Sequence, residues 1–209
     1  MIYLIGGPPR CGKSTAARKL SAATGACYFP ADYVGSMIAS YIPEHDRLAL
    51  WPYSPLDVDT RYATYSPTEI IESYRTRATT ARPALSSLVA YALSDGRDFV
   101  VEGYHVEPAF AREMFTVHGK GAVRSAFLCK HDEAEIAACL AKGVPENDWL
   151  ASNVREESTY LRVATMVSLY SGVVRGEAEQ HRTPSFDMGG DFDGALNRVV
   201  SFLAADRLE

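Results

Sequence analysis

Residues 7–14 read Gly7-Pro8-Pro9-Arg10-Cys11-Gly12-Lys13-Ser14 and fit the pattern G-x-x-x-x-G-K-[ST]. An apolar run precedes them at residues 1–5, and helical spacing of apolar residues follows at 15–23. Glycines let the backbone turn so that successive N–H groups point into one cavity, where the helix N-terminus also attracts an anion. The stretch therefore predicts a site for a nucleoside triphosphate between a strand and a helix.

The residue types in this loop assign roles within that site. Lys13 is expected to reach the β- and γ-phosphates, and Ser14 to ligate Mg²⁺. The residues expected to contact the nucleotide are Gly7, Pro8, Pro9, Arg10, Cys11, Gly12, Lys13, Ser14 and Thr15.

Length and charge restrict the class of protein. A chain of 209 residues suffices for one α/β domain with a proper core, but not for two independent enzymes. Its 26 acidic and 21 basic side chains give a formal charge of -5, with the basic residues dispersed, so we expect no nucleic-acid partner. The start lacks a signal-peptide pattern, and no segment approaches the roughly 20 apolar residues that span a bilayer. We therefore expect a soluble, cytoplasmic protein without a membrane partner, whose oligomeric state the sequence does not indicate.

Short apolar runs alternate with helical patterns, which favours a parallel sheet flanked by helices. The expected strands are 2–5, 26–29, 99–102, 122–129 and 185–188. Ser66 and Glu69 form a capping-box pattern for a helical stretch over 67–94, which Pro83 either bends or splits in two. Further helical patterns cover 148–179 and 192–203.

Residues 43–67 form a proline- and aromatic-rich insertion with weak periodicity. Two interpretations stay open: an apolar flap packed on the core, or a substrate-binding insertion whose aromatics line a pocket. On the second interpretation, Trp51 and Tyr53 are candidate substrate contacts.

Two carboxylates stand where strands end. Asp32 follows the second expected strand and is the first candidate for a general base; the alternative is that it only caps the next helix. Glu102 ends the apolar run Phe99-Val100-Val101-Glu102 and is the candidate Mg²⁺ ligand beside Ser14, unless it is a hydrogen-bonded structural carboxylate. A glutamate at this position also leaves open a second role as the base.

Several cations and one histidine complete the candidate set. Arg155 and Arg162 are seven residues apart, which places both on nearly one helix face, where they either close over the transferred phosphate or remain solvated beside nearby glutamates. Arg75 is a weaker candidate for binding an anionic acceptor. His105 follows Glu102 closely and either contacts the acceptor or makes only local hydrogen bonds.

The loop, the acids at strand ends and the late arginines together resemble the small-molecule P-loop kinases, the group of the nucleoside monophosphate kinases, gluconate and shikimate kinases and chloramphenicol phosphotransferase. Residues 5–15 and 100–108 look particularly like 2-phosphoglycerate kinase-like proteins. The resemblance implies an α/β P-loop NTPase sandwich of three layers, with a five-stranded parallel sheet, helices on both faces, bound ATP and Mg²⁺, and a helical lid. We expect one P-loop kinase domain over 1–209, with a possible substrate-binding insertion at 43–67 and, as the resemblance implies, a lid, placed at about 142–180.

These observations predict an ATP-dependent phosphotransferase that moves the γ-phosphoryl group to a hydroxyl or phosphate of a small-molecule acceptor. Catalysis is assigned to Lys13, Asp32, Arg155 and Arg162. A nucleotide-dependent regulatory switch explains the loop equally well but does not require Asp32. A toxin-like kinase acting on a nucleotide-sugar or another larger substrate is a third reading. The lid region lacks the dense arginine repeats of nucleoside monophosphate kinases, and the insertion has no identified counterpart. The sequence therefore identifies neither the acceptor nor ATP over GTP.

Overall fold

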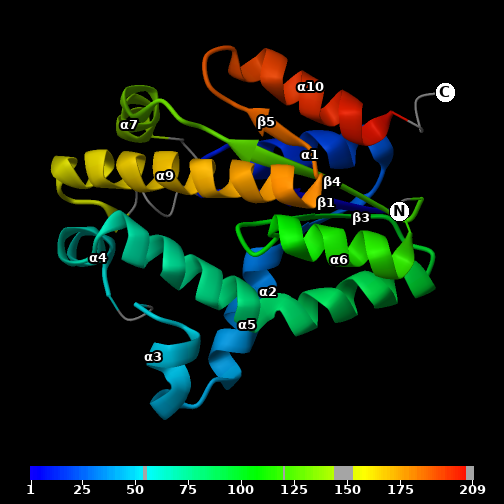
Figure 1. The fold of residues 1–209 in the computed structure, drawn as a ribbon, viewed down its shortest axis with the longest axis horizontal. Coiled ribbons are helices and arrows are strands. Elements are labelled where there is room, and N and C mark those ends of the chain that lie inside the picture. Colours follow the sequence, from blue (N-terminus) through cyan, green and yellow to red (C-terminus); the bar gives the residue numbers. More distant parts are fainter. Residues whose placement is uncertain (54–55, 120, 144–152, 206–209) are drawn as a thin grey trace.

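The computed structural model describes residues 1–53, 56–119, 121–143 and 153–205 of the chain. Within these ranges it forms a single parallel sheet with the strand order β2-β3-β1-β4-β5 (Figure 1). The strands are β1 (Ile2–Gly6), β2 (Cys27–Pro30), β3 (Phe99–Glu102), β4 (Val123–Cys129) and β5 (Ser185–Asp187). The expected strands are thus all present, with ends displaced by at most one residue.

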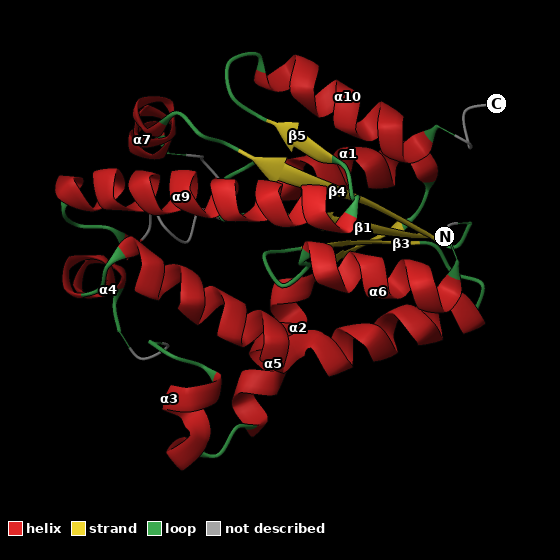
Figure 2. Ribbon diagram, viewed as in Figure 1, coloured by secondary structure: helices red, strands yellow, loops and turns green. Residues whose placement is uncertain are grey.

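Helices cover both faces of this sheet (Figure 2). One face carries α1 (Lys13–Thr24) and α10 (Phe192–Ala204), and the other carries α5 (Pro67–Ser94), α6 (Pro108–His118) and α9 (Glu157–His181). Because both faces are covered, the central strands read as continuous apolar runs rather than alternating ones. Ile2, Leu4 and Ile5 of β1 are fully buried, as are Phe127 and Leu128 of β4. The predicted three-layer α/β sandwich is confirmed.

Helix α5 resolves the question that Pro83 raised. It begins at the predicted capping box, where the Ser66 backbone N–H donates to Glu69 Oε2 at 2.8 Å and the Glu69 N–H donates to Ser66 Oγ at 3.3 Å. It then continues through Pro83 to Ser94 as one helix. Proline removes one intrahelical hydrogen bond, and packing of the buried face of α5 outweighs that loss.

Helix α2 (Ala31–Tyr41) leads from β2 to the predicted insertion, which contains a 3₁₀ turn at Glu44–Asp46, α3 (Arg47–Leu50) and α4 (Val58–Thr64). Helix α7 (Glu133–Lys142), which follows β4 in the chain, packs against α9. Residues 54–55 of the insertion and 144–152 of the predicted lid lie outside the described residues.

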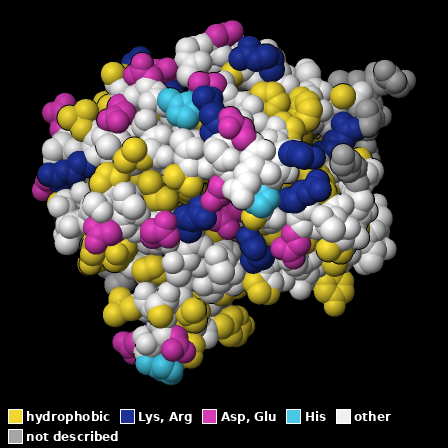
Figure 3. All heavy atoms as spheres, viewed as in Figure 1, with side chains coloured by type: hydrophobic (Ala, Val, Ile, Leu, Met, Phe, Trp, Pro, Cys, Tyr) yellow, Lys and Arg dark blue, Asp and Glu magenta, His cyan; other side chains and the backbone are white. Residues whose placement is uncertain are grey.

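Helix α9 begins at Glu157, and the non-helical residues 154–156 interrupt the helical pattern predicted over 148–179; Asn153 is helical, and 148–152 lie outside the described residues. Among the described residues, no helix combines the length and apolar character that crossing a membrane requires. On the face that Figure 3 shows, basic and acidic side chains are interspersed.

Candidate active site

The loop between β1 and α1 has the backbone geometry of an anion cradle. Gly7 and Gly12 have φ angles of 130° and 83°, which side-chain-bearing residues rarely adopt. A Cβ on Gly7 would lie 2.2 Å from the Leu128 carbonyl oxygen, so only glycine fits there. Gly12 is also the N-cap of α1 and brings no side chain to cap its first N–H groups. These amides are therefore placed to bind phosphate oxygens.

Lys13 is folded over this loop. It is 8 % exposed, and its Nζ donates to the Pro8 carbonyl at 2.6 Å. Cys11 points the other way into the core, 1 % exposed, so it contributes its backbone to the loop rather than a reactive thiol; desolvation raises the pKa of that thiol. The loop thus presents backbone amides and one cation to the space above it.

A carboxylate and two hydroxyls meet beside the loop. Glu102, at the carboxyl end of β3 and opposite Ile5 of β1, is 6 % exposed. Its Oε1 accepts hydrogen bonds from Ser14 Oγ and from the Tyr28 hydroxyl, both at 2.9 Å. Burial and the nearby Glu102 charge raise the pKa of Tyr28 to about 12, so the phenol keeps its proton. Sequence reasoning paired Ser14 with Glu102 but missed Tyr28, because β2 carries no local signal that it neighbours β3.

This arrangement fits a magnesium ion. Carboxylate and hydroxyl oxygens are the hard ligands that Mg²⁺ takes, usually together with water and substrate phosphates. The described residues contain no group of three or more His, Cys, Asp or Glu side chains that could hold a metal alone. A site built from Ser14, Glu102 and nucleotide oxygens agrees with that finding.

Asp32 lies in the first turn of α2, directly after β2. The N-cap of α2 is Pro30, so Asp32 is not the capping residue, and its side chain is 67 % exposed. Oδ1 lies 3.4 Å from His105 Nδ1. Desolvation acts to raise the pKa of Asp32, but the His105 contact and the Lys13 charge outweigh it and lower the pKa. Asp32 is therefore an exposed, ionised carboxylate whose charged form is favoured by the positive charge of Lys13.

Trp51 of the insertion contacts His105, the histidine beside Asp32. His105 is buried and stacks on Trp51, with ring centroids 6.1 Å apart, and the Arg77 guanidinium lies 5.6 Å from the centre of the Trp51 ring. With 9 % exposure, Trp51 is packed like a flap on the core rather than open to a pocket. Arg77 itself is 7 % exposed and donates to the Pro52 carbonyl.

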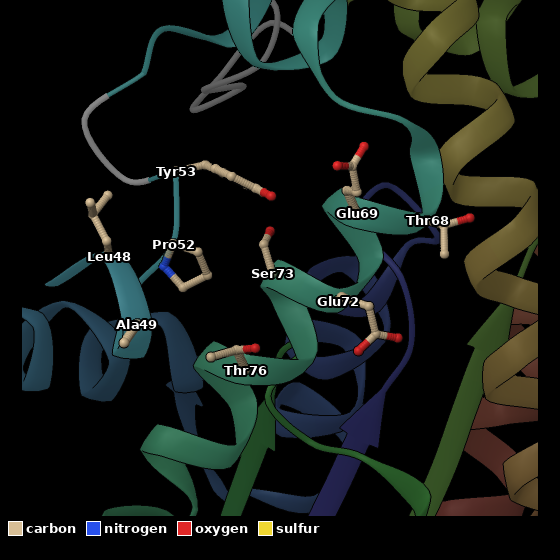
Figure 4. Close-up of a pocket in the computed structure, with 9 residues that line it drawn as sticks. All are labelled: Leu48, Ala49, Pro52, Tyr53, Thr68, Glu69, Glu72, Ser73 and Thr76. Carbon is tan, nitrogen blue, oxygen red and sulfur yellow. The ribbon is translucent and has the colours of Figure 1, made fainter. Parts of the chain in front are cut away.

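Tyr53 lies elsewhere. It adopts a left-handed φ of 58°, stacks on Tyr65 with centroids 3.9 Å apart, and borders a hollow of about 360 Å³ on the outer side of α5 (Figure 4). The lining residues are Leu48, Ala49, Pro52, Tyr53, Thr68, Glu69, Glu72, Ser73 and Thr76. None of them belongs to the phosphate loop, so this hollow is separate from the site above the loop.

The prediction that Arg155 and Arg162 share one helix face is wrong. Arg155 precedes α9, and its backbone N–H donates to Asp59 Oδ2 at 2.9 Å; Asp59 Oδ1 is also bonded to Thr159 Oγ1. The Asp59 carboxylate of α4 thereby ties the segment before α9 to the first turn of that helix. Both arginine side chains are exposed, and Arg162 borders a second hollow of about 250 Å³ between α4, α5 and α9.

Arg75 is already engaged, because its Nη1 pairs with Glu177 Oε1 at 2.6 Å. It is therefore a bridge from α5 to α9, whereas the nearby Arg77 turns inward and lies over the rings of Trp51 and Tyr74.

Comparison with known proteins supports the fold. No protein-family model matches the chain, and no curated protein matches its sequence. Among solved structures, it is similar to a gluconokinase from Sinorhizobium meliloti 1021, with 15% sequence identity and a TM-score of 0.54 over 99% of this chain and 94% of that one. It is also similar to a shikimate kinase from Bacteroides thetaiotaomicron, with 11% identity and a TM-score of 0.53 over 100% and 99% of the two chains. The chain thus has the α/β fold of the small-molecule P-loop kinases.

Proposed function

We propose that the protein is an ATP-dependent phosphotransferase that phosphorylates a small molecule. The observation that carries the proposal is the convergence of three features at one sheet edge: the phosphate loop, the Ser14–Glu102 pair and the exposed Asp32 carboxylate. A nucleotide switch needs the first two but gives no reason for the third. The structural neighbours add the fold in which such a site is expected.

The chain's own groups divide the work. The loop amides and Lys13 would hold the phosphates of the nucleotide, and Ser14 with Glu102 would hold Mg²⁺, which when bound offsets charge on the transferred group. Phosphoryl transfer requires positioning and electrostatic stabilisation more than covalent chemistry from the protein. The preformed loop provides the positioning.

Asp32 is the proposed base. The acceptor hydroxyl gives its proton to the Asp32 carboxylate as its oxygen bonds to the γ-phosphorus, while the bond from that phosphorus to the β-γ bridging oxygen breaks and ADP leaves. A lowered pKa keeps Asp32 ionised at neutral pH, so it is ready to accept the proton. Arg162 and Arg155 stay proposed as cations for the transition state, now as two independent side chains.

Arg77 indicates which acceptors deserve priority. It is a buried guanidinium whose Nη2 donates to the Pro52 carbonyl, its Nε has no hydrogen-bond partner, and no ion pair with a carboxylate is seen for it among the described residues. Burying a cation without an anion is costly, even where aromatic rings compensate in part. Alcohols that also carry a carboxylate or phosphate are therefore the first compounds to test.

The experiment is a panel of acceptors assayed with Mg·ATP, in which ADP release is followed above the background without acceptor. Sugar acids, phosphorylated alcohols, nucleosides, nucleotide-sugars and aminoglycosides form the panel, with GTP replacing ATP in a parallel series. At least one acceptor should raise ADP release at least tenfold, and Asp32→Asn should remove that stimulation while nucleotide binding persists. If no compound stimulates release, or if Asp32→Asn keeps the stimulated rate, the proposal fails.

A further inference from the structure

His105 is a buried histidine whose ring nitrogens have no hydrogen-bond partner. It follows β3 in the turn before α6, is 2 % exposed, and neither Nδ1 nor Nε2 makes a hydrogen bond within the described part of the chain. Buried polar atoms are almost always paired, and exceptions gather where a group has a chemical task. The surroundings of this ring therefore bear on its role.

Three segments hold the ring in place. It stacks on Tyr104 with centroids 3.9 Å apart and on Trp51 of the insertion at 6.1 Å. On α2, a Cβ at Gly35 would lie 2.8 Å from His105 Nε2 and 3.1 Å from the Trp51 ring, so glycine makes the room that this packing needs. The stacking and the close approach of α2 leave the imidazole little freedom to turn.

The ring held in this way presents Nδ1 to Asp32. The 3.4 Å between Nδ1 and Oδ1 is longer than an ordinary hydrogen bond, and catalytic hydrogen bonds are often loose before substrate binds and then tighten. Besides His105, Lys13 is a charged group that lowers the pKa of the Asp32 carboxyl, and the Tyr104 ring stacks on the imidazole.

We propose that His105 is a positioning residue that donates its Nδ1–H to Asp32 and holds that carboxylate toward the acceptor hydroxyl. This inference rests on the proposed function, because Asp32 needs an orientation only if it meets an acceptor. An exposed aspartate otherwise samples several rotamers, whereas a base acts only within hydrogen-bond reach of the proton it takes. The buried imidazole contributes a fixed anchor for an exposed catalytic group.

Two substitutions separate the donor from the packing. His105→Asn places a side-chain N–H near the position of Nδ1–H and keeps the donor, while His105→Phe keeps a stacking ring and removes the donor. We expect His105→Phe to lower kcat about tenfold with KM for ATP unchanged, which is less than the roughly 10²–10⁴ that a general base contributes. His105→Asn should stay within about threefold of the parent protein. His45→Phe, at an 81 % exposed histidine, is the matched control and should change neither constant.

A second measurement does not depend on turnover. Carboxyl ¹³C NMR titration of Asp32 should show a pKa nearer the ordinary aspartate value in His105→Phe than in the parent protein, with His105→Asn between them. If His105→Phe does not fold, Gly35→Ala takes its place. Alanine favours helix α2, but its Cβ would displace the His105 ring, so the Asp32 pKa should shift in the same direction.

The outcomes are distinguishable. If no protein in the set turns over any acceptor, the proposed function fails, and the titration still decides the contact between His105 and Asp32. Equal kcat in the parent and His105→Phe, or equal losses in His105→Phe and His105→Asn, overturns the positioning role. An Asp32 pKa that is the same in all variants overturns it as well.

Discussion

Tyr28 is predicted to orient the metal-binding carboxylate, and Tyr28→Phe tests this role. The substitution removes one hydroxyl and keeps the ring. In the structure, Glu102 Oε1 accepts from two donors, Tyr28 and Ser14, each at 2.9 Å, and Glu102 is only 6 % exposed. With Ser14 Oγ engaged by a bound Mg²⁺, Tyr28 would remain as the donor that fixes the Glu102 carboxylate.

The expected change in Mg²⁺ dependence follows from the loss of one of these two hydrogen bonds. A hydrogen bond to a charged group contributes about 1.5–3 kcal/mol, and partners behind metal ligands typically change metal affinity by about 10–100-fold. Tyr28→Phe should therefore raise the Mg²⁺ concentration for half-maximal activity by about 10–100-fold. The rate at saturating Mg²⁺ should change less, because Ser14 and Glu102 are both retained.

The assay is acceptor-dependent ADP release, or nucleotide binding by calorimetry, as a function of Mg²⁺ at fixed ATP. Tyr41→Phe is the matched control, since Tyr41 is 87 % exposed on α2. An unchanged Mg²⁺ dependence in Tyr28→Phe would refute the reasoning that Glu102 holds the metal and that Tyr28 orients it.

Three further predictions follow from the packing and the charges. Gly7→Ala should abolish nucleotide binding measured by calorimetry, because the new Cβ would lie 2.2 Å from the Leu128 carbonyl oxygen at a φ of 130°; retained binding would refute the loop geometry. Phe127→Ala should lower the free energy of unfolding in urea by about 3–5 kcal/mol, since Phe127 is fully buried in β4; a loss below about 1 kcal/mol would contradict that burial. The Thr159 hydrogen bond lowers the pKa of Asp59 below its ordinary 3.8. Ionised Asp59 therefore stabilises the folded protein above that pH, and this contribution is lost as the pH falls through the lower folded-state pKa. As the pH is lowered, the Tm of Asp59→Asn should therefore decrease less than the Tm of the parent protein, and equal decreases would contradict this.

The parts of the site that sequence reasoning located are those written in local patterns. The phosphate loop is eight consecutive residues, and Glu102 closes an apolar run, so neither depends on knowing the sheet order. Apolar runs likewise identified the strands; β1, β3 and β4 are buried in the centre of the sheet, whereas the edge strands β2 and β5 are only partly covered.

The missed features depend on neighbours distant in the chain. Tyr28 meets Glu102 because β2 pairs with β3, and 74 residues separate the two side chains. Arg155 and Arg162 fail to share a face because Arg155 lies before α9, in a segment bonded to Asp59, which is 96 residues earlier in the chain. A helical spacing of seven predicts a shared face only within one continuous helix.

The most direct test of the central claim is transfer of the γ-phosphoryl group to an acceptor, followed by ³¹P NMR with Mg·ATP and the best compound from the panel. We expect a new phosphate ester signal that grows as ATP is consumed, is lost in Lys13→Ala, and forms at least about 100-fold more slowly in Asp32→Asn. Release of inorganic phosphate alone, with no phosphorylated acceptor, would contradict it.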